Sequence, residues 1–155
     1  MQWGLKSYPE VTYVLLIVRT RFQYLFMRPH TLQGYSYGSL ISSRQPPLPA
    51  PHRLSHVILS YPLSPRGALT LFRSGTYQAA LDALVRTPAG RILVVYGAED
   101  EFTSEAKYDV WADGLCAGAQ ASLHVVKVED ATHFWQGEAR TRLHEAVFAW
   151  LDKTT

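Results

Sequence analysis

Short apolar segments alternate along most of this 155-residue chain with longer stretches in which apolar and polar residues mix. Continuous apolar segments rich in β-branched and aromatic residues predict buried strands over residues 11–18, 56–61, 91–96 and 122–128. Helical spacing and end signals predict a short helix after Gly38, a mixture of loop and helix over 68–86, and full helices over 104–119 and 138–153. This alternation favours an α/β fold, in which a mostly parallel sheet is covered by helices on both faces.

Apolar stripes on two of the helical segments identify candidate core positions. One stripe, within the 68–86 segment, consists of Tyr77, Leu81, Leu84 and Val85. The other, in the last helix, consists of Leu143, Val147, Trp150 and Leu151. Stripes with helical spacing are more typical of a buried core than of a ligand site. We therefore expect both to pack against the sheet.

Two stretches follow neither the helical nor the strand period of apolar residues. Residues 19–33 mix arginine, phenylalanine and tyrosine with proline and histidine, and we expect them to be irregular. The predicted strand at 11–18 therefore ends well before Gly34. Residues 45–51 contain four prolines, which predicts a stiff loop.

Composition narrows the classes of function. Apolar residues make up 47% of the chain and charged residues 18%, as in a globular protein, and a net charge of +2 is too small to predict a nucleic-acid partner. Cys116 is the only cysteine and the histidines lack metal-ligand spacing, so we expect no disulfide, no metal and no other cofactor.

The amino-terminal part of the sequence bears on location. The apolar run at 13–18 is too short to span a bilayer and no cleavage site follows a basic start, which predicts no stable membrane insertion and a cytoplasmic protein. The basic and aromatic residues of 19–28 could form a membrane-surface patch, but a solvated basic face is the simpler interpretation.

One pentapeptide, Gly34-Tyr35-Ser36-Tyr37-Gly38, carries chemical information. The pattern G-x-S-x-G describes a strand-to-helix turn so tight that it calls for glycine at both flanking positions. Such a turn holds its serine in a strained conformation, with the hydroxyl directed away from the backbone. The alternative is that Ser36 is an ordinary turn residue.

Two further candidates follow predicted strands. Asp100 comes just after the strand at 91–96 and His133 just after the strand at 122–128. Because reactive groups in parallel sheets collect at the carboxyl ends of the strands, these side chains are expected at one edge. Glu99 and Asp130 compete with Asp100, and His133 taken alone could be a hydrogen-bonded loop histidine. The remaining candidates are His52 in the proline loop, His124 in a strand and His144 on a helix.

Together these segments resemble the α/β-hydrolase family. The matching residues are GYSYG at 34–38, VVYGAEDEFTS at 94–104 and VEDATHFWQG at 128–137, in the family's order of serine, acid and histidine. The resemblance covers residues 34–155, the carboxyl-terminal half of that fold, and is nearest to small esterase-like members.

The resemblance implies a serine hydrolase that acts on an ester or related acyl bond of a small-molecule substrate. Ser36 would be the nucleophile, His133 its base and Asp100 the group that orients the imidazole. The backbone N–H of Tyr37 would supply half of an oxyanion hole. The side chains of Tyr35 and Tyr37 would contribute to the acyl pocket.

The sequence also departs from the family pattern. Family members carry four or five strands before the serine, whereas only 11–18 reads as a strand here, and no HGG-type segment supplies a second oxyanion donor. We therefore divide the chain into 1–33, a residual strand plus an irregular insertion, and 34–155, the hydrolase-like half.

These departures predict a truncated or aberrantly translated form, such as one with a retained intron. The alternative function is a non-catalytic hydrolase-fold remnant or interaction module. An unpaired sheet edge would favour self-association.

Overall fold

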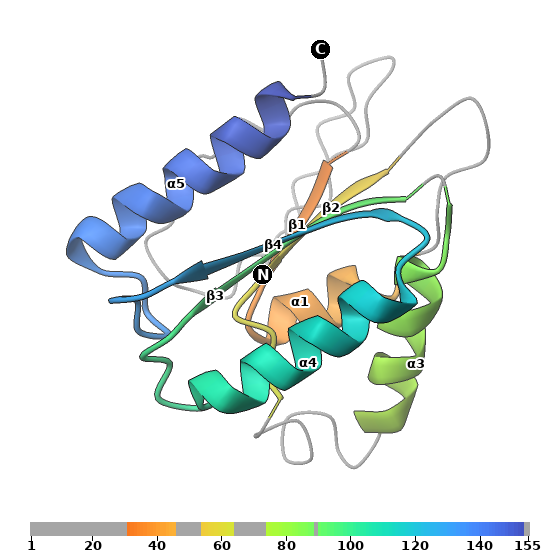
Figure 1. Cartoon of the computed structure of the whole chain (residues 1–155), viewed down its shortest axis with the longest axis horizontal. Helices are drawn as coiled ribbons and strands as arrows, with labels where there is room; N and C mark the ends of the chain where they lie inside the picture. Colours follow the sequence, from red (N-terminus) through yellow and green to blue (C-terminus); the bar gives the residue numbers. More distant parts are fainter. Residues whose placement is uncertain (1–30, 46–53, 64–73, 89, 154–155) are drawn as a thin grey trace, which may run out of the picture.

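A computed structural model describes residues 31–45, 54–63, 74–88 and 90–153 of the chain. Four strands and four helices alternate along these residues (Figure 1). In chain order they are β1 (Thr31–Tyr35), α1 (Tyr37–Ser42), β2 (Ser55–Leu59), α3 (Ser74–Val85), β3 (Arg91–Gly97), α4 (Glu105–Gly118), β4 (Ser122–Val128) and α5 (Gly137–Asp152).

The four strands form one sheet in the order β1-β2-β3-β4, and every neighbouring pair is parallel. Helices α1, α3 and α4 cover one face of the sheet, and α5 covers the other (Figure 1). The predicted α/β architecture, with a parallel sheet between helices, is therefore confirmed. All four strands point the same way, so the segments that follow β1, β3 and β4 meet at one edge of the sheet.

The continuous apolar character of β3 follows from burial on both faces. Ile92, Val94 and Tyr96 belong to the core cluster on the α3 and α4 side, whereas Leu93 and Val95 belong to the cluster under α5. Successive side chains of a strand point to opposite faces, so a strand covered on both faces needs apolar residues at every position.

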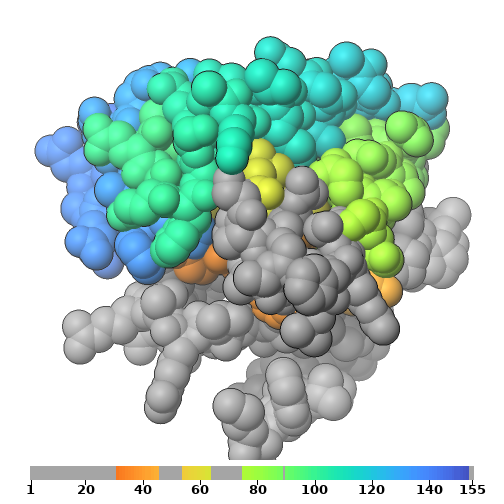
Figure 2. All heavy atoms as spheres, turned by 90° about the horizontal axis from the view of Figure 1, so that it is seen from below, coloured from red at the N-terminus to blue at the C-terminus, as the bar shows by residue number. Residues whose placement is uncertain are grey.

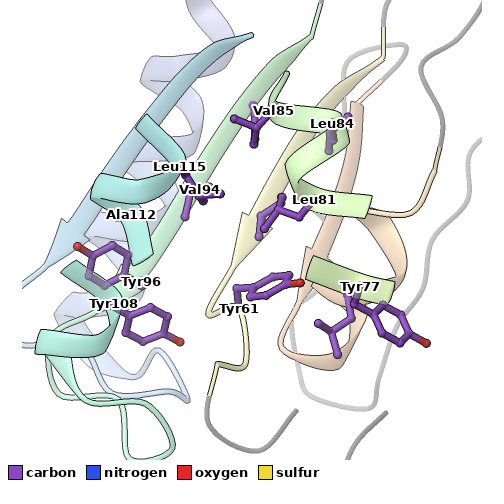
Figure 3. Close-up of a cluster of buried hydrophobic side chains, with 13 residues drawn as sticks. Tyr61, Tyr77, Leu81, Leu84, Val85, Val94, Tyr96, Tyr108, Ala112 and Leu115 are labelled. Carbon is purple, nitrogen blue, oxygen red and sulfur yellow. The ribbon is translucent and has the colours of Figure 1, made fainter. Parts of the chain in front are cut away.

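Both predicted apolar stripes are buried. The α3 stripe of Tyr77, Leu81, Leu84 and Val85 joins α4 residues in one core cluster (Figure 3). The α5 stripe of Leu143, Val147, Trp150 and Leu151 packs on the opposite face. Figure 2 shows α3 and α4 as adjoining parts of one surface of the molecule. Ser104 precedes α4 as predicted, although its side chain makes no capping hydrogen bond.

The prediction that residues 19–33 are irregular is wrong over residues 31–33. Thr31–Tyr35 forms β1, which pairs with β2 from Thr31 opposite Ser55 to Tyr35 opposite Leu59. The sequence TLQGY is only partly apolar and most of its residues are half-buried, so it lacks the continuous apolar signal of β3. Pairing with β2 supplies what local propensity does not. The predicted strand at 11–18 and residues 19–30 lie outside the described residues.

Within the described ranges, β1 pairs with β2 alone, so its second edge has no partner strand there. The expectation of self-association through such an edge stays a prediction. The helices in these ranges include none long and apolar enough to cross a membrane.

Candidate active site

Ser36 lies at the turn between β1 and α1. Its φ of 52° and ψ of −121° place a non-glycine residue in a sparsely populated backbone region. Two backbone–backbone hydrogen bonds hold this conformation: the Ser36 N–H donates to the Leu59 carbonyl at 2.9 Å, and the Ser36 carbonyl accepts from the Ser39 N–H at 2.9 Å. The turn is therefore fixed on one side by β2 and on the other by the first turn of α1.

The two glycines that flank this turn differ in the space available for a side chain. A Cβ added to Gly34 would overlap the Gly38 carbonyl and the Ser42 hydroxyl, so the close approach of β1 to α1 requires glycine there. A Cβ added to Gly38 would meet no described atom within 4 Å. The prediction that the turn requires glycine on both sides therefore holds in the described structure only at Gly34.

Asp100 is buried in the loop between β3 and α4, and its carboxylate is fully engaged. Oδ1 accepts hydrogen bonds from the backbone N–H groups of Phe102 at 2.9 Å and Thr103 at 3.1 Å. Oδ2 accepts from the Tyr108 hydroxyl at 3.3 Å. Burial raises the pKa of Asp100, but hydrogen bonds from His133 and these N–H groups outweigh it and leave the pKa below its ordinary value. Asp100 is therefore an ionised acceptor.

His133 joins Asp100 to Ser36. Its Nδ1 lies 2.6 Å from Asp100 Oδ2, and its Nε2 lies 3.0 Å from Ser36 Oγ. Because the carboxylate can only accept, Nδ1 carries the proton and Nε2 is free to accept from the serine hydroxyl. The structure thus brings together three side chains that are far apart in the sequence, in an arrangement that can remove a proton from Ser36.

The main chain of His133 is held on both sides. The Glu101 carboxylate accepts a hydrogen bond from the His133 N–H at 2.8 Å, and the Tyr35 hydroxyl donates to the His133 carbonyl at 2.7 Å. Burial, with smaller contributions from the charges of Asp100 and Glu101, raises the pKa of Tyr35 to about 12, which keeps its hydroxyl protonated as a donor. The acyl-pocket role of Tyr35 stays a prediction; what the structure shows is that its hydroxyl contacts the histidine loop.

Sequence reasoning did not identify Glu101. Its only signal is its position next to Asp100, which does not reveal where its side chain points. The sequence points to Tyr35 only through its aromatic ring, because its hydrogen bond to His133 depends on the conformation of a loop that follows a different strand. Both contacts are long-range and leave no periodic pattern in the sequence.

The loop that carries His133 rests on the end of β3. The Ala98 N–H donates to the Val128 carbonyl and the Glu99 N–H donates to the Ala131 carbonyl, each at 3.0 Å. Further along, the buried Trp135 indole donates to Ser60 Oγ at 2.9 Å. Trp135 also packs in the core under α5. These contacts tie the loops after β2, β3 and β4 together.

Gly97 makes this close approach possible. A Cβ at Gly97 would overlap the Ala131 carbonyl, which is a backbone atom and cannot rotate away. We expect Gly97→Ala to lower the free energy of unfolding by about 1–3 kcal/mol, because the Ala131 segment must shift within a packed region. Urea denaturation measures the change.

Gly114→Ala is the matched control for Gly97→Ala. Gly114 is exposed inside α4, and an added Cβ meets no described atom within 4 Å. The same substitution should there raise the free energy of unfolding by about 0.5–1 kcal/mol, since alanine is the better helix former. Equal effects of both substitutions would contradict the proposed close approach at Gly97.

Tyr37 is the first residue of α1. In the described part of the chain no acceptor takes its backbone N–H, as expected in the first turn of a helix. Its side chain is partly exposed, and a hydrogen bond with Tyr77 raises the pKa of its phenol. The N–H next to Ser36 is thus available to an oxygen bound at the serine.

The competing candidates lie elsewhere. Glu99 is exposed, and Asp130 forms an exposed ion pair with Arg142 at 2.9 Å. His124 is exposed on β4, and His52 lies outside the described residues. His56, a histidine outside the candidate set, is buried within β2, where burial lowers its pKa to about 4. Over the described ranges, no group of three or more histidine, cysteine, aspartate or glutamate side chains is arranged to hold a metal ion.

Comparison with protein families and with curated proteins finds no match. Solved structures do match. The esterase domain of a Rhodothermus marinus protein superimposes with a TM-score of 0.57 at 16% identity, over 79% of this chain and 60% of that one. A propionate-bound thermophilic esterase, Est2 of Thermogutta terrifontis, gives 0.55 at 19% identity, over 79% of this chain and 55% of that one.

These likenesses identify the fold. The chain has an α/β-hydrolase-like fold, as its motifs implied, and its structural neighbours are esterases. It spans between 55% and 60% of the length of the two neighbours described above. At such low sequence identity the comparison extends to the fold and not to the chemistry.

Proposed function

We propose that the protein is a serine hydrolase that cleaves an ester or related acyl bond of a small molecule. The observation that carries this proposal is the relay of hydrogen bonds from Ser36 Oγ through His133 to Asp100, at 3.0 and 2.6 Å. The strained backbone of Ser36 supports it further, because such strain concentrates at functional sites. The esterase neighbours are consistent with it.

In the proposed reaction, Ser36 Oγ attacks the substrate carbonyl while His133 Nε2 takes the serine proton. The tetrahedral intermediate collapses as the imidazolium returns that proton to the leaving oxygen, which departs as an alcohol. A water molecule, deprotonated by His133, then attacks the acyl-serine ester. Collapse of the second intermediate releases the carboxylic acid and regenerates the serine hydroxyl.

Asp100 stays ionised throughout and stabilises the imidazolium that forms in both steps. The backbone N–H of Tyr37 donates to the oxyanion of each tetrahedral intermediate; losing one such donor typically costs about 10²–10³ in turnover. We assign no second donor among the described residues. This is the observation that keeps a non-catalytic remnant or interaction module as the second candidate function.

Other expectations from the sequence remain proposals. We take residues 31–155, which include β1, as the hydrolase-like unit in place of 34–155. Self-association through the open edge of β1 and a cytoplasmic location stay predictions.

A fluorophosphonate probe tests the proposed function directly, because it reacts with a serine hydroxyl only where a neighbouring base activates it. We expect the folded protein to be labelled once, with the adduct located on Ser36 by mass spectrometry of its peptides. Heat-denatured protein is the control and should not react. A folded protein that is not labelled, or is labelled at another serine, would favour the non-catalytic alternative.

A further inference from the structure

Two phenylalanine side chains contact the imidazole of His133 and remain about half exposed. Phe102, in the loop after Asp100, is 48% exposed, and Phe134, which follows His133, is 47% exposed. Their ring centroids lie 4.8 and 5.6 Å from that of the imidazole, and both ring planes are tilted 83° to it. The two phenylalanine rings are themselves 6.1 Å apart. We call Phe102 and Phe134 the aromatic rim.

The aromatic rim is not accounted for by packing. A large apolar side chain gains stability when it is buried, and neighbouring apolar residues left in water commonly mark a binding surface. Phe148 on α5 is also exposed, at 41%, but no aromatic ring among the described residues packs against it, and it counts as ordinary surface. The aromatic rim differs because its two rings adjoin each other and the proposed base.

The chemistry of acyl transfer indicates what would occupy this surface. In the proposed function, on which this inference rests, His133 Nε2 returns a proton to the leaving oxygen. The alcohol must therefore lie against the imidazole as it departs. Substituents of that alcohol extend from an oxygen next to the imidazole, the ring against which both rim rings pack. The acyl part lies instead at Ser36 and the Tyr37 N–H.

We propose that Phe102 and Phe134 bind the alcohol portion of the substrate and select esters of apolar, ring-bearing alcohols. Aromatic rings favour tilted or offset contacts with other rings over contact with water. The two rings come from different loops, one after β3 and one after β4, so both loops contribute to selectivity for the leaving group.

Two esters that share an acyl group, benzyl acetate and methyl acetate, test this proposal. We expect the wild-type protein to have the higher kcat/KM for benzyl acetate. Phe102→Ala and Phe134→Ala should each lower the ratio of benzyl to methyl kcat/KM by about three- to tenfold. Phe148→Ala is the matched control and should leave the ratio unchanged.

The rate of deacylation distinguishes an aromatic rim that binds the alcohol from one that only supports the imidazole. Both esters give the same acetyl-enzyme, and the alcohol has left before water attacks. The single-turnover rate of deacylation should therefore stay at the wild-type value in both rim variants. Slower deacylation together with equal losses for both esters would show that the rings only support His133, and would overturn the proposal.

The remaining outcomes distinguish this inference from the proposed function. Hydrolysis of both esters with an unchanged ratio in Phe102→Ala and Phe134→Ala overturns the role of the aromatic rim and leaves the hydrolase intact. An equal fall of the ratio in Phe148→Ala also overturns it. Wild-type protein that hydrolyses neither ester and is not labelled by the fluorophosphonate overturns both.

Discussion

Alanine at Ser36 or at His133 is expected to lower kcat for ester hydrolysis by about 10⁶-fold, and the double variant by no more than either single one. The reason is that nucleophile and base act as one unit: without Nε2 at 3.0 Å the hydroxyl keeps its proton, and without Oγ the base has nothing to activate. Initial rates on an activated ester, measured for the wild-type, single and double variants, check both the size and the non-additivity.

Ser122→Ala and His124→Ala are the matched controls for this cycle. Both side chains are exposed on β4, away from the relay, and each substitution deletes the same chemical group as its counterpart. Their rates should equal that of the wild-type protein. Losses that multiply in the Ser36→Ala, His133→Ala double variant would indicate that the two side chains act independently, which contradicts a shared proton transfer.

The positions of Asp100 and His133 could be predicted because they depend on the strongest signals in the chain. β3 and β4 have clear apolar patterns with definite ends, and in a parallel sheet the carboxyl ends of neighbouring strands must adjoin. Locating two strands in the sequence was therefore enough to place an acid and a histidine at one edge. The register of β3 with β4, which sets Gly97 opposite Val128, brings the two loops that carry them together.

β1 could not be predicted in the same way. Its five residues, TLQGY, include a glutamine and a glycine, and the glycine allows close contact with α1. Local propensity therefore points away from a strand. The requirement for Gly34 arises from the approach of α1 to the strand, which only the folded chain reveals. Gly34, which the close packing of α1 requires, thus weakens the apolar pattern that would identify the strand.

The residues that hold the loop carrying His133 could not be predicted from the sequence either. Tyr35 at the end of β1 and Glu101 in the loop after β3 contact the histidine loop through their side chains. Trp135 lies within that loop, has a φ of 49° and contacts Ser60. Periodicity describes single helices and strands, whereas these contacts join the histidine loop to the end of β1 and to the loops after β2 and β3. The sequence therefore predicts that Ser36, Asp100 and His133 lie together, which the structure shows, but not the residues that hold them.

Asp100→Asn is the substitution with the next largest expected effect, a fall in kcat of about 10⁴-fold. The backbone N–H groups of Phe102 and Thr103 require an acceptor at the Oδ1 position, so the asparagine carbonyl oxygen must take that place. The amide NH₂ is then directed at His133 Nδ1, at the position from which Oδ2 now accepts. Nδ1 becomes an acceptor and the imidazole proton moves to Nε2. A protonated Nε2 cannot accept the proton of Ser36.

The pH dependence and a matched variant make this last prediction sharper. Because the hydrogen bonds to Asp100 keep its pKa below the ordinary value, its carboxylate stays ionised throughout the range in which an unperturbed histidine titrates, near 6.5. The loss should therefore persist across neutral pH instead of disappearing at one end of that range. Asp130→Asn removes an exposed carboxylate that pairs with Arg142 and should keep the wild-type rate. A full rate in Asp100→Asn at pH 7 would show that Asp100 does not set the tautomer of His133. A comparable loss in Asp130→Asn would show that the effect is not specific to Asp100.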